Sequence, residues 1–286
     1  MTEWREWPSW RRLAAIARAP ITGAAAAGSL AATNLADLVD SIGKYAPEAY
    51  PRAVKEVSLE LLERQPAIAP LVTIVNTAFL NLADPPELLA AELRATAERM
   101  ARSASVLSKV GAALVPAGST VLTAGGSGSV RDLLILAGDS RSFSVACAET
   151  MPYGEGIELA ADLAAAGLRV EVIPDDQVAD AVPGIDLVIF GAAAVGPDAA
   201  MNAVGTAAIA ERARFFSVPV YLVASIDKAL PAPLFERAVA AGTAAGQFEP
   251  VPLRSVSAVV TELGILEPLG AGKLAAERTV AKALLR

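Results

Sequence analysis

The chain has 286 residues, and 54% of them are hydrophobic although only 5% are aromatic, because alanine supplies much of the apolar content. Its formal net charge is −7 and its Lys and Arg residues form no cluster, so we expect no nucleic-acid partner. It contains no histidine, which excludes imidazole acid–base catalysis and histidine-ligated metal sites, including the Ser-His-Asp and Cys-His mechanisms. We therefore expect a folded, alanine-rich α/β protein without a metal site.

The N-terminal segment contains an arginine pair followed by an uncharged stretch, Ala19 to Ala36. The stretch is rich in Ala, Gly, Thr, Ser and Asn rather than in Leu and Ile, so it would gain little from entering a bilayer. We expect no membrane span, no twin-arginine signal and a cytoplasmic location. Trp4, Trp7 and Trp10 recur every three residues, and we expect them to pack against helices of the same chain or a partner subunit.

The first part of the chain is predicted to be helical. From Trp10 to about Ser105 the apolar residues recur at helical spacing, and prolines divide this pattern into separate helices. A long helix over 92–107, with charged residues on one side, leads into the second half and places the boundary near Lys109. We expect a helical domain over residues 1–108 and a second domain over residues 109–286.

Beyond Lys109 the pattern changes to short apolar runs separated by helical segments, 156–166 and 205–216 among them. The runs are predicted to be buried strands and comprise Thr120–Leu122, Phe143–Ala148, Arg169–Ile173, Leu187–Phe190 and Val220–Ala224. Alternating strands and helices predict an α/β domain with a Rossmann-like, doubly wound parallel sheet. In such sheets ligands bind beyond the carboxyl ends of the strands, so the loops that follow them are candidate sites.

The stretch Thr123-Ala-Gly-Gly-Ser-Gly128 follows the first predicted strand and precedes a helix. Glycine lets the backbone approach a ligand closely, and a helix start offers unpaired N–H groups at the positive end of its dipole. We therefore expect Gly125, Gly126 and Ser127 to bind an anionic ligand. Ala124, Gly125 and Gly126 supply no acid, base or nucleophile, so the turn is suited to binding rather than to reaction.

The loops after the second and third strands carry acids. Glu149 is expected either to hydrogen-bond sugar hydroxyls or to anchor its own loop. Asp175 and Asp176 stand where a dinucleotide-binding fold places its ribose-binding acid, but the glycine-rich turn is only a fragment of the GxGxxG pattern. We therefore favour a helix N-cap for these aspartates and expect no cofactor.

Two further loops offer groups for an anion. The segment from Gly191 to Thr206 is predicted to be a long uncharged loop that ends at a helix start, where Asn202, Gly205 and Thr206 form a second candidate anion site. Lys228 lies just past the strand that ends at Ala224, where its ammonium could meet a phosphate or remain in solvent.

The only cysteine, Cys147, lies within an apolar run that is typical of a strand. A reactive thiol needs basic neighbours or a helix start, and this segment shows neither. We expect Cys147 to be a core residue.

Several short segments together resemble a known family, in order and spacing: Gly23-Ala24, Arg64-Gln-Pro66, Asn76, Thr123–Ser127, Glu149-Thr-Met-Pro152 with Gly156, Gly191-Ala192, Asn202 with Gly205-Thr206, and Thr261–Ile265. They resemble the regulatory subunits of translation initiation factor 2B and the related isomerases of methylthioribose 1-phosphate and ribose 1,5-bisphosphate. The resemblance covers most of the chain. It implies a helical N-terminal domain and a Rossmann-like C-terminal domain through which members commonly dimerise.

The resemblance also implies that the usual isomerase chemistry is missing. The isomerases use a cysteine and an aspartate at positions that are Gly125 and Ala193 here. Their arginine and lysine at two further positions are replaced by Met151 and Ala203. Aldose–ketose isomerisation moves protons between carbons and between oxygens, which glycine and alanine cannot do.

Other positions of the resemblance are retained. It implies that Gly23, Arg64, Ser127 and Lys228 help hold one phosphate group of the ligand, and Glu149 and Asn202 also persist. We hypothesise that the protein binds a small phosphorylated metabolite without the usual isomerase chemistry and forms a homodimer. The expected ligand-binding residues are Gly23, Arg64, Gly125, Gly126, Ser127, Glu149, Asn202, Gly205, Thr206 and Lys228.

Two alternatives stay open. A diverged sugar-phosphate isomerase would use Glu149 with Asp175, Asp176 or Asp198 as proton-transfer groups, and Glu149 would then be catalytic. A non-catalytic interaction subunit would instead recognise another protein.

Overall fold

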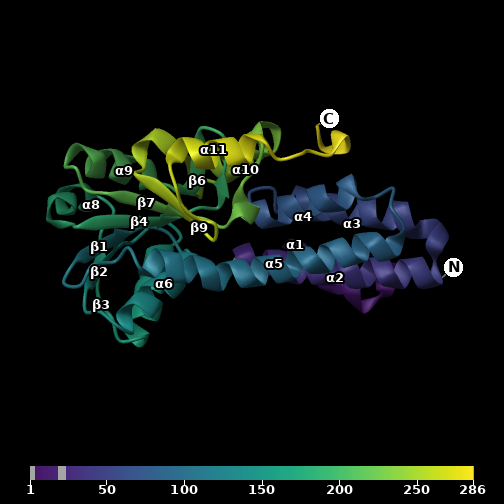
Figure 1. The fold of residues 1–286 in the computed structure, drawn as a ribbon, viewed down its shortest axis with the longest axis horizontal. Coiled ribbons are helices and arrows are strands. Elements are labelled where there is room, and N and C mark those ends of the chain that lie inside the picture. The colour runs from purple at the N-terminus through teal and green to yellow at the C-terminus, as the bar shows by residue number, and fades with distance from the viewer. Residues whose placement is uncertain (1–3, 19–23, 286) are drawn as a thin grey trace. The chain divides into compact units, whose positions relative to one another are not determined.

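The computed structural model describes residues 4–18 and 24–285. They form two compact units (Figure 1). The first unit extends to Arg102 and includes the C-terminal segment from Arg278, and the second unit is Ser103–Glu277. From the sequence we expect two domains, residues 1–108 and 109–286, each of which would fold on its own. This division stays a prediction.

The first unit is helical, as expected. Its elements are η1 (Trp4–Glu6), α1 (Pro8–Arg18), α2 (Ala24–Tyr45), η2 (Pro47–Ala49), α3 (Tyr50–Arg64), α4 (Ala69–Leu80), the first part of α5 (Pro86–Ala112) and η6 (Lys282–Leu284). Leu35, Leu38 and Ile42 recur at helical spacing in α2 and are fully buried. Trp4 and Trp10 are also buried and meet edge to face, with ring centroids 4.7 Å apart. No helix within the described ranges is long and apolar enough to cross a membrane.

The C-terminal segment is joined to the first unit by the side chain of Asn76 on α4. Its amide nitrogen donates to the carbonyl of Thr279, and its amide oxygen accepts from the N–H of Ala281, both at 2.8 Å. Ala281 and Leu284 are buried in the same segment. A single asparagine thus satisfies two backbone groups of an irregular segment, as a neighbouring strand would.

The second unit contains a seven-stranded sheet, which confirms the predicted α/β class. The strand order is β10-β9-β7-β4-β1-β2-β3, and every neighbouring pair is parallel except β9 and β10. The bounds are β1 (Thr120–Thr123), β2 (Ser144–Ala148), β3 (Arg169–Ile173), β4 (Leu187–Gly191), β7 (Val220–Val223), β9 (Ala258–Thr261) and β10 (Gly264–Leu266). The five strands predicted from apolar runs are β1, β2, β3, β4 and β7. The expectation that all are buried on both faces is wrong for β3, which lies at an edge and is largely exposed.

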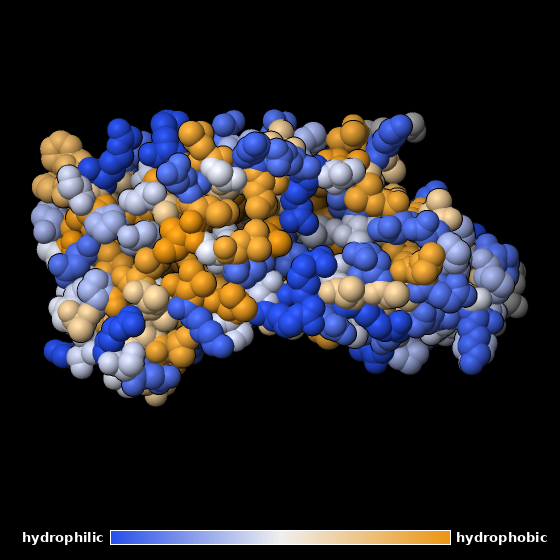
Figure 2. Space-filling view, viewed as in Figure 1, coloured by the Kyte–Doolittle hydropathy of each residue, from blue (hydrophilic) through white to orange (hydrophobic). Residues whose placement is uncertain are grey.

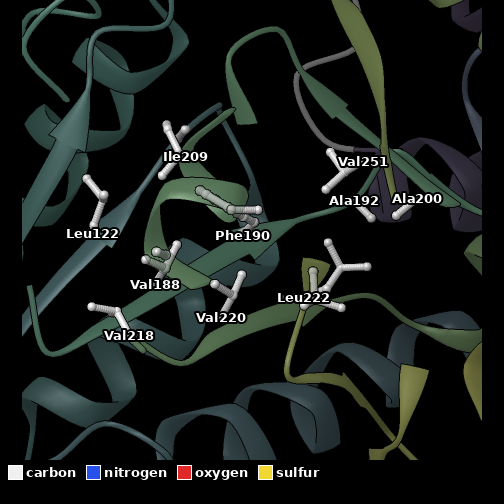
Figure 3. Packing of buried hydrophobic residues seen from close by; sticks show 14 of the residues in the cluster. Leu122, Val188, Phe190, Ala192, Ala200, Ile209, Val218, Val220, Leu222 and Val251 are labelled. Carbon is white, nitrogen blue, oxygen red and sulfur yellow. The ribbon is translucent and has the colours of Figure 1, made fainter. Parts of the chain in front are cut away.

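Two helical layers cover the sheet. The second part of α5 packs on one face together with α6 (Gly128–Gly138) and α7 (Glu155–Ala165), over Val121, Ile189 and Cys147. The other face packs against α8 (Val178–Ala181), α9 (Thr206–Phe215) and α11 (Pro268–Ala276), over Leu122 and Phe190. Figure 3 shows Phe190 in this second core beside Val188 and Ile209. Alternate residues of one strand thus serve two cores, as a sheet covered on both faces requires.

A second, three-stranded antiparallel sheet extends the carboxyl end of the first, and the sequence did not predict it. It consists of β5 (Ala194–Val195), β6 (Ala199–Ala203) and β8 (Phe248–Pro252), with α10 (Ala232–Ala244) packed on β8. The expectation of a long loop from Gly191 to Thr206 is therefore wrong, because β5 and β6 form a hairpin there. Ala192, Ala200 and Val251 lie together in Figure 3 and continue the apolar core into this sheet.

Candidate functional site

The glycine-rich turn lies between β1 and α6, as predicted, and two of its N–H groups already have partners. Gly125 has φ of +82°, a conformation that favours glycine, and its N–H donates to Thr150 Oγ1 at 3.0 Å. The N–H of Gly126 donates to Glu155 Oε2 at 3.3 Å. Both acceptors belong to the loop after β2 and the start of α7. An anionic ligand that used these two N–H groups would have to displace the chain's own side chains.

Ser127 is the N-cap of α6 and approaches the end of β4. Its hydroxyl accepts from the N–H of Val130 at 3.4 Å. A Cβ atom added at Gly191 would lie 2.3 Å from both Cβ and Oγ of Ser127. Residue 191 therefore has to be glycine for Ser127 to sit beside the end of β4.

Lys228 lies on the other side of the same strand end, in the short helix η4 (Ile226–Lys228) after β7. Its ammonium is buried, with 5% of the residue exposed, and donates to the carbonyl of Ala192 at 2.7 Å. Burial lowers the pKa of Lys228 from 10.5 to about 8, because no charge repays the loss of water. Lys228 forms no ion pair within the described part of the chain, although its neighbour Asp227 is also buried. The ammonium has three donors, so two of them make no hydrogen bond to the described residues.

The acid-bearing loop after β2 is anchored by the carboxylate of Asp175, although several residues of this loop are exposed. The carboxylate of Asp175 accepts from the N–H groups of Thr150 at 2.9 Å and Met151 at 2.8 Å. Both donors lie in a turn where Thr150 has φ of +59°. The favoured interpretation of Asp175 as a helix N-cap is therefore wrong, because it satisfies a turn. Glu149 is half-buried, and its carboxylate makes no hydrogen bond to the described residues.

At the second candidate anion site, the start of α9, an acidic side chain of the protein again bonds to a backbone N–H group. Glu249 on β8 accepts from the N–H of Ala207 at 2.8 Å. Asn202 on β6 is buried and donates to Thr206 Oγ1 at 3.2 Å, while Gly205 is the N-cap with φ of +95°. An acid at this end of a helix is stabilised by the helix dipole, so Glu249 competes with any added anion.

Many of the predicted binding residues converge within the second unit. A Cβ atom added at Gly125 would lie 3.2 Å from Ala203 Cβ and 3.7 Å from Asn202 Oδ1, which places β6 against the turn. Ser127 and Lys228 approach adjacent residues at the end of β4. Arg64 is exposed at the end of α3 in the first unit, and Gly23 lies outside the described residues. Their part in the site stays a prediction.

Sequence reasoning missed three residues of this site. Glu155 accepts from Gly126 and also from Gln247 Nε2, the latter at 3.0 Å, and Thr150 accepts from Gly125. The one available signal for Glu155 was its place in Gly154-Glu155-Gly156 at a helix start, where acids are favoured. Nothing local to the sequence indicated Gln247.

Cys147 is fully buried on β2, as the sequence predicted. Burial raises the pKa of its thiol to about 12, so the thiolate is not formed near neutral pH. The described residues contain no group of three acidic or cysteine side chains arranged to hold a metal ion.

The sequence of this chain is similar to that of several known proteins. The sequence model of the initiation factor 2 subunit family matches residues 76–242, which is more than half of the chain. The chain belongs to this family. A protein of Pyrococcus abyssi named translation initiation factor eIF-2B subunit 2-like is 28% identical over 227 residues, 76% of this chain and 82% of that protein. Ribose 1,5-bisphosphate isomerase of Methanocaldococcus jannaschii is 26% identical over 273 residues, 88% of this chain and 89% of the isomerase.

The fold of this family member also matches a solved structure. The crystal structure of translation initiation factor eIF-2B from Pyrococcus horikoshii has a TM-score of 0.75 at 22% identity and covers 91% of this chain and 97% of that chain. The match confirms the architecture. Because the relatives of this chain include both a factor-like protein and a sugar-phosphate isomerase, similarity alone does not assign its function.

Proposed function

We propose that this initiation factor 2 family member binds a small phosphorylated metabolite and does not catalyse aldose–ketose isomerisation. The buried ammonium of Lys228 carries the binding half of the proposal. A buried charge without a counter-ion is costly, and a phosphate group would supply both the negative charge and acceptors for the two remaining donors. The isomerase relative, whose name specifies a phosphorylated sugar, supports the same class of ligand.

The absence of isomerase chemistry is supported by the groups around the turn. Proton transfer needs acids or bases that reach the substrate. Asp175, one of the candidate bases, already accepts two backbone hydrogen bonds, and the only thiol of the chain is in the core. Asp198 is exposed between β5 and β6 of the second sheet. Glu149 is the one half-buried acid of the expected set whose carboxylate forms no hydrogen bond in the described ranges.

Calorimetric titration with ribose 5-phosphate and other sugar phosphates tests the proposal. We expect wild type to bind at least one of them and Lys228→Met to lose about tenfold or more of that affinity, because a hydrogen bond to a charged group contributes about 1.5–3 kcal/mol. Lys273→Met is the matched control, since its ammonium is mostly exposed and lies next to Glu277. Equal affinity in wild type and Lys228→Met would contradict the binding site. Turnover that Glu149→Gln abolishes would instead establish a diverged isomerase.

A homodimer formed through the second unit is part of the same proposal. Leu263, Ile265 and Leu269 lie on or beside the edge strand β10 and are exposed to 63%, 52% and 87%. Figure 2 shows apolar side chains gathered on the face where Figure 1 places β9 and α6. An uncovered apolar edge of this kind favours association with a second chain.

A further inference from the structure

At the carboxyl end of the sheet, acidic side chains of the chain already accept hydrogen bonds from several backbone N–H groups. Glu155 accepts from Gly126, Asp175 from Thr150 and Met151, and Glu249 from Ala207. A further acid, Glu262, accepts from the N–H of Ile226 in the turn that carries Lys228. These N–H groups are therefore already bonded to acids, whereas the buried cation Lys228 pairs with no acid among the described residues.

Glu155 is the acid that lies against the glycine-rich turn itself. Its two carboxylate oxygens are fixed separately, Oε2 by the N–H of Gly126 and Oε1 by Gln247 Nε2. A Cβ atom added at Gly126 would lie 3.2 Å from Glu155 Cβ, and one added at Gly125 would lie 3.8 Å from Glu155 Oε2. The carboxylate thus occupies the space above both glycines, where a bound group would approach the turn.

The position of Glu155 determines which chemical groups of a ligand can bind at the glycine-rich turn. A phosphate brought to the N–H of Gly126 would meet the charge of Glu155 at short range, and like charges across a contact reduce affinity strongly. A hydroxyl group would not, because it can donate a hydrogen bond to a carboxylate. The two ends of the site are therefore complementary to different groups: a phosphate at Lys228 and a hydroxyl at Glu155.

We infer that Glu155 determines ligand specificity, so that the ligand carries a single phosphate group and presents hydroxyl groups to the glycine-rich turn, while bisphosphorylated sugars are rejected. The inference rests on the proposed function, because it requires phosphate binding at Lys228. To the proposed function the inference adds the class of ligand, a polyhydroxylated monophosphate, and the residue that selects this ligand.

Calorimetric titration of the full chain with ribose 5-phosphate and ribose 1,5-bisphosphate tests this inference. We expect wild type to bind the monophosphate at least about tenfold more tightly than the bisphosphate. Glu155→Gln keeps an acceptor for the Gly126 N–H but removes the charge, so the preference should shrink by about tenfold through a gain in bisphosphate affinity. Glu158→Gln is the matched control, because it removes the same charge from an exposed position one turn along α7 and should leave the preference unchanged.

The outcomes separate this inference from the proposed function. Monophosphate binding that Lys228→Met weakens, together with equal or tighter binding of the bisphosphate by wild type, would overturn the role of Glu155 alone. An unchanged preference in a folded Glu155→Gln variant, verified by its circular dichroism spectrum, would do the same. If wild type binds neither sugar phosphate, the proposed function fails and this inference fails with it.

Discussion

At the scale of single residues, Lys228 couples the stability of the protein to pH. Its pKa falls from 10.5 in the unfolded chain to about 8 in the folded one, so unfolding takes up a proton between these two values. The free energy of unfolding should therefore rise by about 3 kcal/mol as the pH is raised from 8 to 10.5. Below pH 8 both states are protonated, and the folded state retains the full cost of the buried charge.

Urea unfolding of wild type and Lys228→Met over this pH range checks the expectation. The variant should be the more stable protein at pH 7 and should lack this rise, because methionine fills a similar space without a charge. Lys273→Met should follow wild type, since Lys273 is mostly exposed. Parallel curves for wild type and Lys228→Met would mean that the ammonium is not buried as the structure has it.

The sequence predicted the position of the candidate site better than its interactions. The turn at Gly125 and Gly126 before a helix and the place of Lys228 after β7 were predicted from local patterns, whereas the role of Ser127 as the N-cap of α6 was not. The acids that bond to the N–H groups of Gly126 and Ala207 are 29 and 42 residues away in the chain. Local patterns hold no information on such pairs, because the fold alone brings them together.

At the scale of elements, the end of α5 depends on a side chain from the loop before β2. Arg141 Nη1 donates to the carbonyl of Ala112, the last residue of α5, at 2.6 Å and to that of Val115, just beyond the helix, at 3.0 Å. The Ala112 carbonyl accepts otherwise only a longer bond of 3.3 Å from the N–H of Val115 among the described residues, so Arg141 strengthens the C-terminal cap of α5. Arg141→Met should lower the free energy of unfolding by about 1–3 kcal/mol. Chemical denaturation measures this change. Arg169→Met, at an exposed position on the edge strand β3, should change stability little, and equal effects of the two variants would contradict the capping role.

Elements of different composition were predicted unequally well. The strands of the parallel sheet contain runs such as Leu187–Gly191, in which bulky apolar residues are buried on both faces. The β6 strand reads Ala-Ala-Met-Asn-Ala and contains no β-branched residue, so its local preference does not favour a strand. Its partners β5 and β8 and the core around Val251 hold it in place instead.

At the scale of the whole molecule, the proposed homodimer can be tested at its expected surface. Sedimentation velocity should show a dimer for wild type and a monomer for the double variant Leu263→Lys with Ile265→Lys, because both side chains are exposed at the β9–β10 hairpin. The control, Leu30→Lys with Leu88→Lys, changes two leucines of the first unit that are exposed to 53% and 60%. If the variant Leu263→Lys with Ile265→Lys is still a dimer, the interface lies elsewhere. A monomeric wild type would contradict the proposed homodimer.

The burial of Cys147 has a practical consequence for such work. Since it is the only cysteine of the chain and has no exposed surface, an alkylating reagent can reach its thiol only when β2 and the helices that cover it, α6 and α7, move apart. The rate of alkylation in the native protein would therefore report opening of the core between the central sheet and these helices. A cysteine introduced at an exposed position such as Met151 would be labelled selectively, which allows a fluorophore to be placed next to Thr150, the residue that accepts from Gly125 of the glycine-rich turn, without removing any native residue of the core.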